Sequence, residues 1–296
     1  MGIQSQEISE RQAEPRRDRR TSAPTFGPER RHSILTAEPE RCLRRMPGRE
    51  TFVWPGLDQP APEGRLIVKR FERRGSLMRR RSPAQREYEL LSELYATGLP
   101  VPQPYFWAQE GRRSVLAMEL VEHGETLRMR LERLAQEAVQ DTGEDSVEPA
   151  PAQLEVRWLV DELAHIVAQL HGRGWYHKDL YLDHVLVRRG TLDPGRLVLI
   201  DLGRARREPA PRLRWFIKDL AALLHSTPAS IGPRLRLAFL ARYLSLRGVL
   251  PGHGGRADRR RWVRRIERKQ ARMAAHRPRA GEHVPEHLAA ERELRS

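Results

Sequence analysis

Two aspartates lie at the edges of short apolar segments with the character of β-strands. Asp179 belongs to YHKDLYLDHVLV, and Asp201 belongs to LVLIDLGRAR. A carboxylate in such a setting is costly unless something binds it. The pair therefore indicates a site that binds a cation or a hydrogen-bond donor, although either residue taken alone could equally be an aspartate that stabilises a turn.

The charge balance adds a second clue. The chain has 54 basic and 39 acidic residues and a formal net charge of +15, but its only lysines are Lys69, Lys178, Lys218 and Lys269. This excess suggests a polyanionic neighbour such as nucleic acid, an anionic membrane surface or a phosphorylated substrate, while a codon bias toward arginine is the simpler explanation. The same bias makes each remaining lysine more informative. Because the chain has no recognisable DNA- or RNA-binding motif, we expect no specific nucleic-acid partner.

Length and composition exclude several classes of protein. The 296 residues can build one large domain or two modest ones, and the single cysteine, Cys42, excludes an internal disulfide and a cysteine-ligated metal cluster. No segment approaches the ~20 uninterrupted apolar residues of a membrane span. The first 20 residues lack the apolar core of a secretory signal. We therefore expect a cytoplasmic chain, in solution or peripheral on a membrane.

Strands dominate the first half of the chain. Residues 1–37 are basic and lack apolar periodicity, so they are predicted to be a disordered tail. Short strands are expected near 41–45, 51–54 and 66–68, with a turn at DQPAPEG, and two more are expected in PYFWAQ and SVLAMELV. Between them, Ser82 and Pro83 can begin a helix that Gly98 ends.

Helices dominate the second half. An acidic loop is expected at 140–151, followed by a long helix with one apolar stripe that stops near Gly172. Two short β-type runs, RLVLIDLG and the segment around Asp179, precede further helices. The last of these carries Trp262, Val263 and Ile266 at helical spacing among arginines. We favour its packing on the helical lobe, with a basic face for anionic lipid as the alternative.

The aspartate segments resemble the loops of the protein-kinase-like fold. His177-Lys178-Asp179 followed by His184 matches H-R-D-x-x-x-x-N, and Asp201-Leu202-Gly203 matches D-F-G. Upstream, Lys69 stands in IVKRF, the analogue of V-A-I-K, and Glu87 lies on the predicted helix. The four pieces occur in the order that the fold requires.

Three further sequence features are the H-x-D-x-Y-x-x-H loop, an Arg-Glu-Tyr on the first helix before GLPVPQP, and IDLGRAR. In these features the chain resembles the bacterial lipopolysaccharide-core kinases, the Kdo and heptose kinases. A histidine in the position of His184 is common in that family. No G-x-G-x-x-G is present, and only Gly48, in RRMPGRET, stands where a hairpin would cover the nucleotide.

The resemblance implies a role for each residue. Asp179 would orient the acceptor hydroxyl, and Asp201 would hold Mg²⁺. His184 would be a weak second metal ligand or a hydrogen-bond partner of Asp179, and we favour the second role or a single-metal site. Lys69 would bind the ATP phosphates, paired with Glu87. The remaining residues would contact adenine through the backbone (Met118, Glu119, Leu120 and Val121) or support the catalytic loop (His177, Lys178 and Asp219).

The sequence therefore predicts an α+β, two-lobed kinase-like fold. It would have a β-rich N-lobe at 38–122, a helical C-lobe at 123–275 and a C-terminal tail at 276–296. The expected activity is ATP-dependent phosphorylation of a sugar hydroxyl, Kdo or heptose, in a lipopolysaccharide core glycolipid. The alternatives are a protein Ser/Thr or other small-molecule kinase, against which the absence of A-P-E argues, and a nucleotide-binding pseudokinase scaffold, against which the intact site residues argue.

Overall fold

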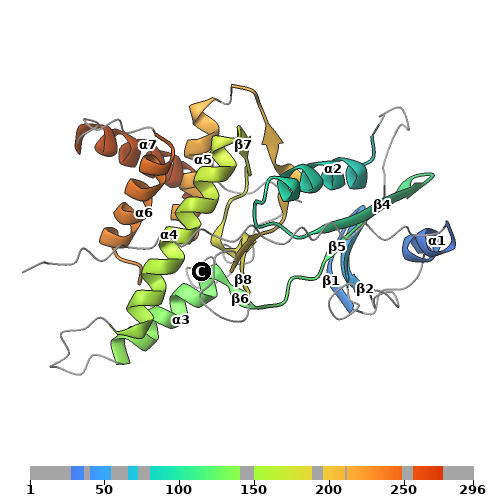
Figure 1. Ribbon diagram of the computed structural model, residues 1–296, viewed down its shortest axis with the longest axis horizontal. Helices are drawn as coiled ribbons and strands as arrows, with labels where there is room; N and C mark the ends of the chain where they lie inside the picture. The colour runs from blue at the N-terminus through green and yellow to red at the C-terminus, as the bar shows by residue number, and fades with distance from the viewer. Residues whose placement is uncertain are drawn as a thin grey trace, which may run out of the picture.

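The computed structural model describes residues 28–36, 41–54, 66–72, 81–140, 150–188, 196–210, 212–248 and 256–275. The predicted turn at DQPAPEG, nearly all of the predicted loop at 140–151, residues 1–27 and the tail at 276–296 lie outside these ranges. Figure 1 shows the main sheet with helices α1 and α2 at one end of the molecule and helices α3 to α7 at the other. This is the mixed α+β, two-lobed class that the sequence predicts, although the boundary at residue 122 stays a prediction.

An antiparallel sheet of five strands, in the order β1-β2-β3-β5-β4, forms the smaller lobe. Its strands are β1 (Arg41–Met46), β2 (Arg49–Trp54), β3 (Leu66–Glu72), β4 (Pro104–Glu110) and β5 (Arg113–Glu119). Side chains alternate between the two faces, as they must in a strand. Leu66 and Val68 join a cluster on one face, whereas Phe71 joins the core that continues into the helical lobe.

Helix α2 (Pro83–Ala96) packs on β4, β5 and β3. As the sequence predicts, Ser82 caps the helix by accepting a hydrogen bond from the Gln85 N–H, and Pro83 fills the first turn. Glu87 is buried on the same face as Leu91 and Leu94. A carboxylate among these leucines requires a partner, and this partner defines the site described below.

The prediction of a disordered tail is wrong for residues 28–36. They form helix α1 (Pro28–Thr36), which lies against β4 and β5. Ile34 and Leu35 are 1% and 4% exposed and join the second core cluster. The reason is tertiary: so short a segment shows no readable periodicity, and its helix is stabilised by burial of two aliphatic side chains.

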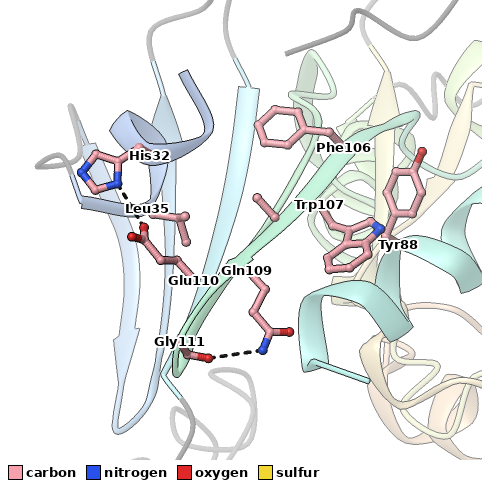
Figure 2. A pocket seen from close by; sticks show the side chains of 9 residues that line it. His32, Leu35, Tyr88, Phe106, Trp107, Gln109, Glu110 and Gly111 are labelled. Carbon is pink, nitrogen blue, oxygen red and sulfur yellow. Dashed lines mark hydrogen bonds and ion pairs between the residues drawn. The ribbon is translucent and has the colours of Figure 1, made fainter. Parts of the chain in front are cut away.

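A hollow of about 860 Å³ lies beside this helix, and Figure 2 shows side chains that line it. His32 of α1 lies 3.0 Å from Glu110 of β4, with Leu35 beside the Glu110 carboxylate, whereas Tyr88 and Trp107 line the side toward α2. None of the predicted site residues lines this hollow.

Five helices and short strands form the larger lobe. The helices are α3 (Leu127–Gln140), α4 (Pro151–Gly172), α5 (Leu213–Ser226), α6 (Pro233–Leu246) and α7 (Arg256–Ala274). A small antiparallel sheet has the order β6-β8-β9, and β7 pairs with β10. These strands are β6 (His123–Thr126), β7 (Trp175–Tyr176), β8 (Val185–Arg188), β9 (Leu197–Leu199) and β10 (Arg206–Arg207).

Helix α7 packs as the favoured interpretation expects. Ile266 is buried in the main core, and Trp262 and Val263 pack against it. Arg260, Arg264 and Arg268 remain exposed. None of the helices that the structure describes is long and apolar enough to cross a bilayer.

Candidate active site

Three elements bring Lys69, Glu87 and Asp201 together. Lys69 lies on β3, Glu87 on α2, and Asp201 just after β9. The Lys69 Nζ donates a hydrogen bond to Glu87 and lies 3.7 Å from Oδ1 of Asp201. Lys69 and Glu87 are 7% and 5% exposed, so neither charge could remain in this position without the other.

The backbone at Asp201 adopts the left-handed conformation, with φ of 54° and ψ of 48°. This conformation is costly for a residue other than glycine and persists only where the surroundings impose it. Burial alone would raise the pKa of the carboxyl group, but the charges of Lys69 and then Arg49 hold that pKa well below its ordinary value. Asp201 is therefore a permanent anion that faces positive groups.

Asp219 of α5 holds the backbone of the loop that precedes Asp179. Its side chain is fully buried, and its two oxygens accept the N–H groups of His177, at 2.6 Å, and Lys178, at 2.8 Å. Lys178 has a positive φ of 74°. Its ammonium group lies over the rings of Tyr176 and Trp215, at 5.6 and 5.2 Å, so its charge contacts aromatic faces beside the loop.

His177 is buried beneath the loop, and its contacts define its tautomer. The Asp179 N–H donates to Nδ1 at 3.3 Å, so the ring proton lies on Nε2 and donates to the Ile200 carbonyl at 3.0 Å. Burial lowers the pKa of this imidazole. The ring links the two aspartate segments, because Ile200 directly precedes Asp201.

Two cations flank the carboxylate of Asp179. Nη1 of Arg204 lies 3.0 Å from it, and the Lys218 Nζ lies 3.6 Å from Oδ1. Lys218 comes from α5 and also donates to the carbonyl of Lys178. Burial lowers the pKa of Lys218, and the neighbouring Asp179 opposes that shift. The carboxylate thus lies between two cations whose positive charge suits an anionic group.

His184 connects the two aspartates. Its Nδ1 donates to the Asp179 carbonyl at 2.7 Å, and its Nε2 lies 3.9 Å from Oδ2 of Asp201. The sequence left two roles open for His184, and the hydrogen bond to Asp179 is present, through the backbone. The Nε2 atom lies beside the carboxylate that is expected to bind metal.

The donor set around Asp201 fits magnesium better than a transition metal. Among the described residues, no group of three or more histidine, cysteine or carboxylate side chains is assembled to hold a metal ion. Mg²⁺ is commonly bound through one or two carboxylates, with phosphate oxygens and water completing its shell. Asp201 supplies one such carboxylate, with His184 beside it.

The predicted adenine-contacting segment lies at the end of β5, and one of its donors is already used. The Glu119 N–H donates to the Gln103 carbonyl at 2.8 Å. The Glu119 side chain accepts hydrogen bonds from the Gln103 N–H and from Arg188. Met118 and Val121 are buried, and Leu120 is partly exposed. Of this segment, the Glu119 amide is therefore not available as a donor to adenine.

Gly48 occupies the turn between β1 and β2, with φ of 79°. Its carbonyl accepts the Glu72 N–H at 2.9 Å, and a Cβ here would lie 3.0 Å from the Glu72 carbonyl oxygen. Gly48 is required by this close packing on the end of β3. The next residue, Arg49, reaches Asp201, with Nη2 3.3 Å from Oδ1.

Sequence reasoning missed four residues of the site: Arg49, Gly203, Arg204 and Lys218. The three cations were hidden in a chain with 54 basic residues, although the scarcity of lysine did point to Lys218. Gly203 belongs to the D-x-G motif, but its contact with Glu87, described in the Discussion, has no signature in the sequence.

Comparison with known proteins gives a family match over the middle of the chain. A sequence model of the lipopolysaccharide kinase (Kdo/WaaP) family matches residues 72–243, which is more than half of the chain. The match includes Glu87, Asp179 and Asp201 but begins after Lys69.

Individual proteins are similar over different parts of the chain. The lipopolysaccharide core heptose(I) kinase WaaP of Pseudomonas aeruginosa is 37% identical over 113 residues, which are 36% of this chain and 42% of that relative. The match thus spans less than half the length of the relative. A solved structure, "WaaP in complex with acyl carrier protein", has a TM-score of 0.57 at 24% identity and covers 81% of this chain and 91% of that one, so the fold is shared. Given the match of the family model, this chain belongs to the lipopolysaccharide kinase (Kdo/WaaP) family.

Proposed function

We propose that this chain is an ATP-dependent kinase that phosphorylates a sugar hydroxyl, Kdo or heptose, of the lipopolysaccharide core. The observation that carries the proposal is the continuous chain of contacts from Glu87 through Lys69 to Asp201, which His184 extends to the backbone of Asp179. It joins a cation for the phosphates, a carboxylate for the metal and a carboxylate for the acceptor. Membership in a kinase family supports ATP as the phosphoryl donor.

Asp179 would accept a hydrogen bond from the acceptor hydroxyl and hold the oxygen in line with the γ-phosphorus. The new O–P bond forms as the bond to the bridging oxygen of ADP breaks, and the hydroxyl proton passes to Asp179 late in the step. Arg204 and Lys218, already beside this carboxylate, place positive charge where the transferred group carries negative charge.

Lys69 would bind the α- and β-phosphates, and its ion pair with Glu87 keeps the ammonium group in position. Bound Mg²⁺ would neutralise charge on the phosphates, with Asp201 as its carboxylate ligand and His184 beside it. Asp219 and His177 do not contact substrate in this scheme. They fix the loop that carries Asp179, with Lys178 braced on the adjacent rings.

The glycolipid acceptor suggests that the protein works at a membrane surface. The exposed Arg260, Arg264 and Arg268 of α7 recur every four residues and so share one helix face. Such a face suits anionic headgroups. Co-sedimentation with vesicles that contain anionic lipid would test this part of the proposal. The substitution of all three arginines by glutamine should abolish binding to these vesicles.

The decisive experiment measures transfer of labelled γ-phosphate from Mg·ATP to lipopolysaccharide core, Kdo-lipid A, free sugars and a generic protein, with Asp179→Ala as the control. Label on a core glycolipid that depends on Asp179 supports both the kinase activity and its substrate. Label on protein alone would keep the activity and overturn the acceptor. Tight ATP binding without any transfer would favour a pseudokinase scaffold.

A further inference from the structure

Arg49 points from the β1–β2 hairpin into the candidate active site. In the antiparallel pairing of β2 with β3, Arg49 lies opposite Phe71 and Thr51 lies opposite Lys69. Paired residues share a face, as do residues two apart along a strand, so Arg49 and Lys69 project from the same side of the sheet. Both reach Oδ1 of Asp201, at 3.3 and 3.7 Å.

The backbone of the hairpin turn has little freedom to close over a ligand. The Gly48 carbonyl is bonded to the Glu72 N–H, and the Gly48 Cα lies against the Glu72 carbonyl. A glycine-rich loop covers phosphates with free backbone N–H groups, and this turn is instead fastened to the end of β3. The group that this hairpin can present to a nucleotide is therefore the side chain of Arg49, in place of backbone N–H groups.

The guanidinium group of Arg49 is held in position but is not fully satisfied. Its Cζ lies 5.6 Å from the centroid of the Phe71 ring, and its Nη2 donates to Asp201. Its Nε is buried and has no hydrogen-bond partner among the described residues. A buried donor without an acceptor costs free energy, which an incoming anion can offset.

Charge counting indicates what that anion is. Arg49 and Lys69 balance Glu87 and Asp201, so the resting site is close to neutral. When Asp201 ligates a divalent cation, this group of residues gains two positive charges, and Arg49 loses its carboxylate partner to the metal. A polyphosphate supplies the missing negative charge and accepts bidentate hydrogen bonds from a guanidinium group.

We propose that Arg49 is a nucleotide-binding residue, whose guanidinium group passes from Asp201 to the polyphosphate of a nucleoside triphosphate when the metal–nucleotide complex binds. The inference rests on the proposed kinase function. It adds a residue that the family match, which begins at residue 72, does not include.

The test compares the affinities of the full-length chain, Arg49→Met and Arg45→Met for Mg·ATP, Mg·ADP and adenosine by calorimetry. Arg45 is the matched control, because it lies on the same hairpin and pairs at the surface with Glu50, 2.8 Å away. Arg49→Met should weaken Mg·ATP binding by about 10- to 100-fold and leave adenosine binding unchanged. Arg49→Lys should restore part of the loss, since it returns the charge but not the planar fork.

Each other outcome overturns the inference. Unchanged Mg·ATP affinity in Arg49→Met would mean that the guanidinium group never contacts phosphate. Tighter binding would mean that Arg49 only blocks Asp201, and an equal loss for adenosine would indicate a damaged pocket. If the unaltered chain binds no ATP, the proposed function fails with it. If that chain binds and transfers phosphate while Arg49→Met behaves identically, only this inference fails.

Discussion

Gly203 and Glu87 pack so closely that a side chain at position 203 would collide with the carboxylate. A Cβ on Gly203 would lie 3.0 Å from Oε2 of Glu87 and 3.4 Å from its Cδ. The end of a glutamate side chain can ordinarily move aside, but this one is buried and pairs with Lys69. A side chain at position 203 would therefore force the Glu87 carboxylate to shift by a few tenths of an ångström.

We predict that Gly203→Ala weakens nucleotide binding, because the added methyl group displaces Glu87 and releases Lys69 from its position. The expected loss in Mg·ATP affinity is about 10-fold, the effect of ~1.4 kcal/mol. Binding by calorimetry, together with a thermal melt, measures it. Gly232→Ala is the matched control, since a Cβ at that position meets nothing within 4 Å. Equal ATP affinity in the two variants would show that Glu87 has room to move.

Replacement of Asp179 by alanine and replacement of Asp201 by alanine should have different effects on turnover and nucleotide affinity. Asp179 touches Arg204 and Lys218, whereas Asp201 faces Lys69 and Arg49. Asp179→Ala should therefore reduce turnover by at least ~100-fold with little change in nucleotide affinity. Asp201→Ala should reduce Mg·ATP affinity as well. Single-turnover phosphoryl transfer and nucleotide titration check the pair, and equal loss of nucleotide affinity in both would contradict separate roles.

Asp219→Asn should slow turnover without weakening ATP binding. Its amide NH₂ cannot accept a hydrogen bond, so either the His177 or the Lys178 N–H loses its partner, at a cost of about 1–3 kcal/mol. Unfolding by urea and steady-state kinetics measure the two effects. Asp161→Asn, which removes a half-exposed carboxylate paired with Arg242, is the control. A drop in stability alone, with normal turnover, would limit Asp219 to a role in folding.

The sequence predicts the parts of the site that depend on spacing. Lys69 and Glu87 are expected on a strand and the following helix, and Asp219 on a helix after the metal loop, and the structure places each of them there. These assignments follow from the resemblance to the kinase motifs, whose order along the chain forms a specific pattern. The scarcity of lysine strengthens that pattern.

The sequence does not predict contacts that depend on long flexible side chains or on tertiary burial. Arg49 and Arg204 are surface-type residues in an arginine-rich chain, and only the packing of the hairpin and the metal loop directs them to Asp201 and Asp179. Helix α1 is a similar case, because its two buried residues are covered only when the helix packs on the sheet.

Helix α1 should contribute measurably to stability. We predict that Ile34→Ala lowers the free energy of unfolding by about 2 kcal/mol or more, because it removes a side chain that is 1% exposed against the sheet. Ser33→Ala, at the exposed neighbouring position, should change it little. Chemical denaturation compares the two. If Ile34→Ala is as stable as the unaltered protein, the helix does not contribute to the core.

Stability should fall as the pH drops below about 6.5, because two buried imidazoles resist protonation. Burial lowers the pKa of His171 and of His177 below the ordinary value of 6.5, although Asp219 opposes both shifts. In the unfolded chain both rings bind protons as the pH falls through 6.5, whereas in the folded chain they stay neutral. Proton binding therefore stabilises the unfolded state, and the free energy of unfolding falls by up to about 1.4 kcal/mol per pH unit for each ring. The stabilisation is complete above pH 6.5 and is lost as the pH falls toward the folded pKa values.

His171→Gln should reduce the pH slope of the unfolding free energy between pH 6.5 and 5, since one of the two protons is no longer taken up. A slope that stays the same in this variant would mean that His171 is protonated in the folded protein, as an ion pair with Asp219, and that the loop anchor is charged, not neutral.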